Sequence, residues 1–145
     1  MSVNYDEPLT FGRNGTVQSL ETTGLDFSEN DSQSWTIAPV VNIELPLAYR
    51  RGALVMDIEA TPFIFPEMVP LQNAFIFMGG LFVGFLSLKG HAIRSFPIAQ
   101  GGINGRTSRL SIVIPTAVSP ASLLISEDQR ELGLDLSSLL FRSTA

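Results

Sequence analysis

Apolar and polar residues alternate at every second position in several stretches of this chain, a period typical of β-strands with one buried face. In the segment 53–59, Leu54, Met56 and Ile58 share one face. The segment 134–141 alternates in the same way. Further short stretches of this kind, separated by Gly, Pro and Asn, are 9–11, 16–20, 35–37, 40–45, 91–96 and 109–114.

Helical periodicity is confined to one short segment near the end of the chain. Ser126 stands three residues before Gln129, the spacing of a capping box, and Glu127 and Asp128 favour a helix N-terminus. We therefore expect one helical turn here, ended by Gly133. Many short strands without helical crossovers predict an all-β protein, a single antiparallel β-sandwich domain spanning residues 1–145 with about eight strands.

The longest apolar run extends from Ala74 to Leu88 and is interrupted by Gly79-Gly80. It is shorter than the ~20 residues that a membrane-spanning helix needs. Two aromatic-rich segments joined by two glycines predict a β-hairpin instead, so we expect no membrane span.

Phenylalanine is concentrated around this hairpin, where six of the ten phenylalanines lie within 23 residues. Consecutive apolar residues along both hairpin strands indicate burial on both faces, and a two-layer sandwich buries only one. We therefore expect a homo-oligomer or partner interface here, formed by Phe63, Phe65, Phe75, Phe77, Phe82 and Phe85. The alternative is a locally thick core under overhanging loops.

Charge is sparse, since only 16% of the residues are Asp, Glu, Lys or Arg, and this suggests that a partner covers part of the surface. The net charge of −5 and the single lysine, Lys89, argue against a nucleic-acid partner. The absence of cysteine excludes disulfides and thiolate metal sites. The N-terminal residues lack the pattern of a secretory signal, so a cytoplasmic location is expected.

Several short motifs occur in an order that resembles a family of bacterial jelly-roll modules of the galactose-binding-like type. Such modules are associated with glycosyltransferases and surface-polysaccharide biosynthesis. The most specific motif is Asp128-Gln-Arg-Glu-Leu-Gly133, followed by Phe11-Gly-Arg13. Less specific matches are 35–36, 41–46, 54–63, 73–83, 111–115 and 119–122. Gly79-Gly80 stands where these modules often have Asn-Gly, and the loop 26–34 lacks their sugar-stacking aromatic residues.

The resemblance implies a jelly-roll fold and a non-catalytic module that binds glycan or scaffolds a polysaccharide-synthesis enzyme. Within it, Trp35 is the candidate sugar-stacking residue, with the alternative that it plugs one end of the sandwich. Four oxygen-bearing side chains lie close to it in the loop 26–31, namely Asp26, Glu29, Asn30 and Asp31. They could bind sugar hydroxyls or, as an alternative, Ca²⁺, but the EF-hand spacing is absent and we expect no metal and no cofactor.

Arg13 lies in a glycine-flanked turn near this loop. The first and last strands of a jelly roll tend to be neighbours, so we expect Arg13 to pair with Asp128 or Glu131. The alternative is an exposed guanidinium that binds a carboxylate or phosphate. The predicted ligand-binding set is therefore Trp35, Arg13, Asp26, Glu29 and Asp31.

Catalytic patterns are weak. His91 is the only histidine, and no Gly-x-Ser-x-Gly motif accompanies it. Asp57 and Glu59 share a strand face ~7 Å apart, a separation between those of retaining and inverting glycosidases. The weak catalytic patterns agree with what the resemblance implies, a non-enzymatic glycan-binding or scaffolding module linked to bacterial polysaccharide biosynthesis. The alternatives are a structural self-assembling subunit of capsid, tail or shell type, or an enzyme that uses this carboxylate pair.

Overall fold

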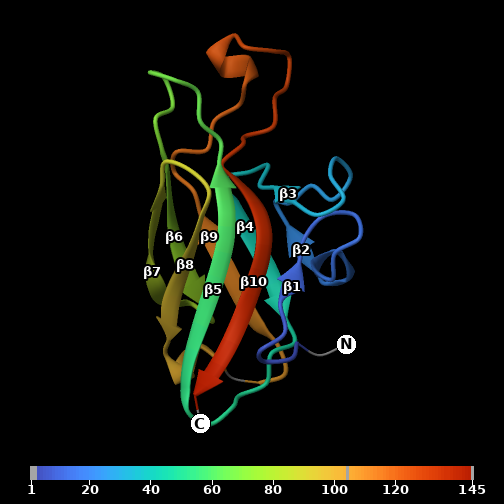
Figure 1. Cartoon of the computed structure of the whole chain (residues 1–145), viewed down its shortest axis with the longest axis vertical. Coiled ribbons are helices and arrows are strands. Elements are labelled where there is room, and N and C mark those ends of the chain that lie inside the picture. Colours follow the sequence, from blue (N-terminus) through green and yellow to red (C-terminus); the bar gives the residue numbers. More distant parts are fainter. Residues whose placement is uncertain (1–2, 104, 145) are drawn as a thin grey trace.

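The computed structural model describes residues 3–103 and 105–144, which form two antiparallel β-sheets packed face to face (Figure 1). Sheet A has the order β1 (Leu9–Thr10), β10 (Leu134–Thr144), β5 (Ala53–Pro62), β8 (Ala92–Ile98), and β3 (Ser34–Trp35) also pairs with β10. Sheet B has the order β2 (Thr22–Thr23), β4 (Val40–Leu45), β9 (Ser108–Val113), β6 (Gln72–Met78), β7 (Leu81–Leu88). The all-β antiparallel sandwich is confirmed.

The described residues hold ten strands rather than about eight, because β1, β2 and β3 have two residues each. Three short 3₁₀ helices complete the structure: η1 (Val17–Ser19), η2 (Gln100–Gly102) and η3 (Ala121–Leu123). Within the described ranges, none of these helices is long and apolar enough to cross a membrane.

The strand β5 shows why the alternating pattern is informative. Its burial alternates along the strand, with Leu54, Met56 and Ile58 buried as predicted. It pairs with β10 on one side and β8 on the other. β10 is also paired on both sides along part of its length, so these two strands form the centre of sheet A.

The predicted hairpin is present as β6 and β7. Gly79 and Gly80 have φ of 58° and 82°, as the central residues of a type I′ turn require, and Met78 pairs with Leu81. Only one face of the hairpin is buried within this chain, which contradicts the alternative of a thick core under overhanging loops and leaves the expected interface a prediction. Ala74 and Ile76 are fully buried, whereas Phe75 points away from the core, because the side chains of a strand alternate even when all are apolar.

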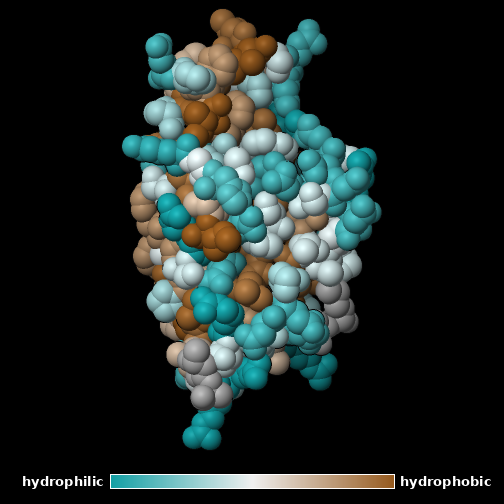
Figure 2. All heavy atoms as spheres, viewed as in Figure 1, coloured by the Kyte–Doolittle hydropathy of each residue, from teal (hydrophilic) through white to brown (hydrophobic). Residues whose placement is uncertain are grey.

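The outer face of sheet A, which carries β5 and β10 toward the viewer, mixes hydrophilic and hydrophobic residues (Figure 2). Asp57 on β5 is bonded to Arg142 on β10 and to Ser95 on β8. Glu59 on β5 accepts a hydrogen bond from Ser138 on β10. Charged groups on this face are thus paired across neighbouring strands.

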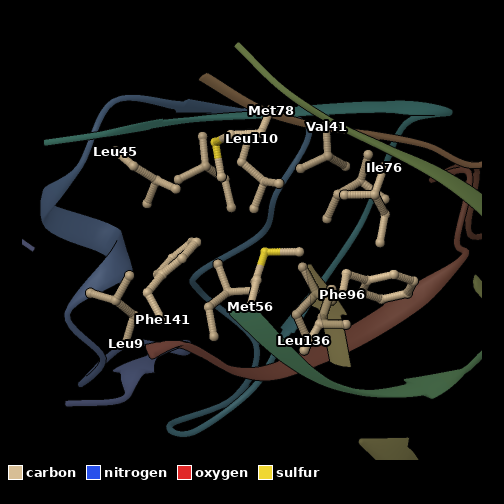
Figure 3. Packing of buried hydrophobic residues seen from close by; sticks show 14 of the residues in the cluster. Leu9, Val41, Leu45, Met56, Ile76, Met78, Phe96, Leu110, Leu136 and Phe141 are labelled. Atoms are coloured by element: carbon tan, nitrogen blue, oxygen red, sulfur yellow. The ribbon is translucent and has the colours of Figure 1, made fainter. Parts of the chain in front are cut away.

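The core lies between the inner faces of the two sheets (Figure 3). Side chains from sheet B, such as Ile76 and Leu110, face side chains from sheet A, such as Met56 and Phe141. Met56, Ile76 and Leu110 have no exposed surface, and Phe141 is 2% exposed. Burial of this apolar surface is the main source of stability.

The strand expected at 16–20 and the helical turn expected at 126–129 are both wrong, because side chains in these segments bond to nearby backbone groups. The segment 16–20 contains η1 rather than a strand, because Thr10 and Thr16 exchange hydrogen bonds between side chain and backbone and close a tight loop. The Ser126 hydroxyl accepts from the Asp128 N–H instead of capping a helix at Gln129. The helical turn lies earlier, at Ala121–Leu123.

Candidate functional site

An aromatic pair lies at the edge of sheet A, where β3 joins β10. The rings of Trp35 and Phe63 are 6.2 Å apart between centroids and nearly perpendicular, at 80°. Trp35 is half-buried on the outer side of the sheet, so it does not plug the end of the core. Phe63 follows β5 directly, and its N–H donates to the Gly133 carbonyl just before β10.

Asp135 is the register partner of Trp35 and therefore projects from the same face of the sheet, directly beside the indole. Its Oδ1 atom is buried and has no hydrogen-bond partner among the described residues. Burial, together with the negative charge of Glu29, raises the pKa of Asp135 to about 6. An unsatisfied buried acceptor next to aromatic rings is suited to a ligand that brings a hydroxyl or amide donor.

Arg130 is the centre of an ion-pair network beside this pair. Its guanidinium donates to Asp26 at 2.9 Å, Glu29 at 2.7 Å and Asp128 at 2.7 Å. The hydroxyl and the N–H of Ser28 lower the pKa of Asp26, with a further contribution from Arg130. Hydrogen bonds from Arg130 likewise lower the pKa of Asp128.

Arg13 binds the other end of the same loop. Its guanidinium donates to Asp31 at 2.8 and 2.9 Å and to the Ser28 carbonyl at 3.3 Å. The expected pairing of Arg13 with Asp128 or Glu131 is therefore wrong. β1 and β10 are neighbours as expected, but Asp128 is bound by Arg130 instead, which leaves Arg13 to bind the loop beside it.

A shallow groove of about 270 Å³ lies next to the Arg13–Asp31 pair. Gly12 lets the backbone of Asp31 pack closely against this turn, because a Cβ at position 12 would stand 2.3 Å from the Asp31 carbonyl oxygen. Gly12 also adopts a φ of 85°, and its N–H donates to the Ser34 hydroxyl. The groove is lined by Thr10, Phe11, Asn14, Gly15, Asp31 and Ser32.

The predicted ligand-binding residues do lie together along the loop 26–35 or against it. Their carboxylates, however, bind arginines of this chain instead of facing a shared ligand site. Asp26, Glu29 and Asp31 bind arginines, so they hold the loop rather than form a common centre. No cluster of three or more metal-ligating side chains occurs among the described residues. Trp35, Asp135 and the second carboxylate oxygen of Asp31 remain as the groups that can contact a ligand.

The other candidate for chemistry, the carboxylate pair on β5, is bound by neighbouring side chains. Arg142 holds Asp57 through two hydrogen bonds and lowers its pKa, with help from Ser95. His91 contacts Glu59 at 2.7 Å, and Ser138 donates to the same carboxylate. Glu59 therefore lies between the serine and the histidine, which is not the order of a catalytic triad.

Sequence reasoning did not identify Asp135, Phe63 as the neighbour of Trp35, or Arg130 as the centre of the network. The outward position of Asp135 could have been predicted, because Asp135 stands between Leu134 and Leu136 in an alternating strand. The pairing of β3 with β10, which places Trp35 beside it, has no local signature because the two strands are 100 positions apart.

No protein-family model and no curated protein matches the sequence. Solved structures do match the fold. The chain is similar to the CBM36-1 domain of a multidomain xylanase from the hindgut metagenome of Trinervitermes trinervoides, with TM-score 0.53, 8% identity, and 96% and 98% of the two chains covered.

Two further carbohydrate-binding modules resemble the chain to the same degree. A family 35 module from Clostridium thermocellum has TM-score 0.54 and 8% identity, over 95% of this chain and 99% of the other. A β-1,3-glucan binding CBM6 from Bacillus halodurans has TM-score 0.53 and 12% identity, over 99% of both chains. At these identities the likeness establishes the jelly-roll fold.

Proposed function

We propose that this chain is a non-catalytic module that binds a neutral glycan at Trp35 and Asp135. The observation that carries the proposal is the half-buried Trp35–Phe63 pair beside the unpartnered Oδ1 of Asp135. Aromatic rings contact the apolar face of a pyranose, and a carboxylate accepts from its hydroxyls. The likeness to carbohydrate-binding modules supports this reading.

The charge of the site favours a neutral ligand over an acidic one. Asp26, Glu29 and Asp128 outnumber the single guanidinium of Arg130 that they surround. Asp31 lines the adjacent groove, and its second carboxylate oxygen is available as a further acceptor beside Arg13. In the proposal, Arg13, Asp26 and Glu29 position the loop, while Trp35, Asp31 and Asp135 contact the sugar.

The proposal includes a role beside an enzyme of bacterial polysaccharide synthesis. Its support is the resemblance carried by the motif 128–133, to which the structure gives a physical role. Asp128 and Arg130 of this motif bind the loop next to Trp35. This link and the cytoplasmic location stay predictions.

The test is binding of the purified chain to an array of neutral and acidic bacterial polysaccharides, with three variants applied to identical arrays. Trp35→Ala and Asp135→Ala should each reduce binding of neutral glycans at least tenfold. Phe82→Ala, which changes an exposed phenylalanine on the opposite sheet, should bind like the unmodified chain. Circular dichroism of each variant confirms folding.

Two outcomes contradict this proposal. One is a folded chain that binds no glycan on the array. The other is binding that Phe82→Ala abolishes and Trp35→Ala leaves intact, which would move the site to sheet B.

A second candidate function is a self-assembling structural subunit, favoured by the uncovered phenylalanines of sheet B. Phe75, Phe82 and Phe85 are exposed on its outer face, and Phe77 packs against Phe82. Phe63 and Phe65, expected in the same interface, lie instead in the loop after β5. Light scattering after size-exclusion chromatography distinguishes the functions, because a large closed assembly favours the structural subunit.

A further inference from the structure

Hydrophobic residues gather at one end of the sandwich, at the top of the view in Figure 2. Two loops form this end, 63–71 after β5 and 114–133 before β10 (Figure 1). Between them lies an apolar groove of about 400 Å³. Its lining includes Met68, Leu71, Val118 and Leu123. We call the two loops and this groove the apolar tip.

Backbone hydrogen bonds hold both loops in fixed shapes. Phe65 and Val69 exchange two backbone hydrogen bonds of 3.0 and 2.8 Å, which close the first loop into a tight turn. Val118 and Leu132 exchange two bonds of 3.0 Å at the base of the second loop. A surface whose shape is already fixed loses little conformational entropy on binding.

Leu124 places an exposed apolar side chain at a backbone position that glycine usually occupies. It follows η3 at the left-handed position of a Schellman motif, in which the Leu124 N–H donates to Ala121 and the Ile125 N–H donates to Pro120. Glycine is the usual residue there, because a side chain at positive φ is sterically disfavoured. Leu124 nevertheless has a φ of 59° and is 93% exposed.

The first loop shows the same feature. Among the described residues, only three that are not glycine have a positive φ, and Glu67 is one of them, at 70°. Beside it, Met68 is 55% exposed. Local strain at exposed apolar turns indicates a function outside the fold itself.

The charges around the apolar tip are predominantly acidic. The two loops carry Glu67, Glu127, Asp128 and Glu131 against one arginine. That arginine, Arg130, is already bound to Asp26, Glu29 and Asp128. A partner complementary to this surface therefore combines apolar side chains with positive charge.

We propose that the apolar tip docks a basic amphipathic segment of another protein. Apolar side chains of that segment fill the groove and contact Leu124, and its Lys or Arg residues face Glu67, Glu127 and Glu131. A second copy of the chain is disfavoured, because it would bring the same acidic loops together. A membrane containing anionic lipid is disfavoured for the same electrostatic reason.

The test is a selection of random twelve-residue peptides displayed on phage against the full chain, with prior subtraction on the Leu124→Gly variant. Glycine suits the Schellman position, so this variant should keep or raise its melting temperature. We expect the selected peptides to combine large apolar residues with Lys or Arg. By fluorescence anisotropy, a selected peptide should bind Leu124→Gly at least tenfold more weakly.

Two further variants sharpen the result. Glu67→Lys/Glu127→Lys should weaken binding at least fivefold and reduce its dependence on salt. Ile93→Ser is the control, because Ile93 is an apolar residue exposed on sheet A rather than at the apolar tip, and it should bind like the unmodified chain.

Three results overturn the proposal. One is failure to enrich any peptide that distinguishes the unmodified chain from Leu124→Gly. Another is a consensus without basic residues. The last is sedimentation of the chain with phosphatidylcholine vesicles that Leu124→Gly abolishes, which would assign the apolar tip to a lipid surface.

Discussion

The outer faces of the two sheets use opposite kinds of side chain over a shared core. On sheet A, Asp57 and Glu59 are bonded to groups on adjacent strands, including Arg142 and Ser138. On sheet B, Phe85 pairs with Phe75 in the next strand, at 5.1 Å between ring centroids, and the two side chains are 49% and 39% exposed.

Folding requires only that the inner face of each sheet be apolar, so the side chains of the outer faces are free to serve other purposes. Both faces satisfy the alternation that buries the opposite side chains, so both are compatible with the sandwich. Among the described residues of sheet A, Asp135 is the one with a buried side-chain polar atom that has no hydrogen-bond partner. The phenylalanines of sheet B pair with one another, but their exposed part can be removed from water only by something outside the chain.

The largest expected effect contrasts an inward with an outward phenylalanine. Phe141→Ala should lower the free energy of unfolding by about 3–5 kcal/mol, because it leaves a cavity between the sheets. Phe85→Ser should change it by less than about 1 kcal/mol, since half of that side chain is already exposed. Urea unfolding measures both. Equal losses would show that Phe85 is part of the fold rather than of a free surface.

A charge placed on the aromatic face should act on association instead. Phe82→Glu should raise the dissociation constant of self-association at least tenfold, about 1.4 kcal/mol, measured by analytical ultracentrifugation. Ile93→Glu, on the outer face of sheet A, is the control and should leave association unchanged. An unmodified chain that remains monomeric at high concentration would remove the basis for an interface on sheet B.

Asp135, the buried carboxylate of sheet A without a hydrogen-bond partner, should destabilise the folded chain when it is ionised. Because the pKa of Asp135 is raised to about 6, the folded chain binds the proton more tightly than the unfolded chain, and stability falls as pH rises from about 4 to 6. Asp135→Asn should therefore stabilise the chain by about 1 kcal/mol at pH 7 and by less at pH 4. Thermal unfolding at the two pH values measures this. A difference that does not depend on pH would contradict the raised pKa.

The smallest expected effect concerns the paired part of sheet A. Hydrogen bonds from Arg142 lower the pKa of Asp57, so the stabilisation is present above the ordinary pKa of aspartate and is lost as pH falls through the lowered value. Arg142→Met should lower the melting temperature at pH 7 by more than the exposed-site control Arg106→Met. At strongly acidic pH the two variants should become alike.

Most of the fold follows from the sequence, because alternation and turn residues are local signals. The limits of β4 and the glycine turn between β6 and β7 could be predicted from the sequence. The segment 16–20 could not, because its shape depends on two threonines that bond to each other's backbone. Hydrogen bonds from side chains to nearby backbone compete with strand formation, and they produce no periodic pattern in the sequence.

The candidate site is less predictable, because its residues meet only through long-range strand pairing. The sequence indicates that Asp26, Glu29 and Trp35 share a loop, but not that Arg130 reaches two of them from more than 100 positions away. Which of two arginines binds which carboxylate depends on the path of the last loop. Neither composition nor spacing encodes that path.

The position of β10 also constrains how the chain can fold. Leu139 pairs with Leu9, 130 positions earlier, and with Ile58 on its other side. Sheet A therefore cannot close until β10 has left the ribosome, and until then β5 lacks one of its two neighbours. Contacts between such distant positions are typical of chains that fold in milliseconds to seconds rather than microseconds. During that interval the exposed edge of β5 is open to pairing with another chain, which makes early truncation of the chain a route to aggregation.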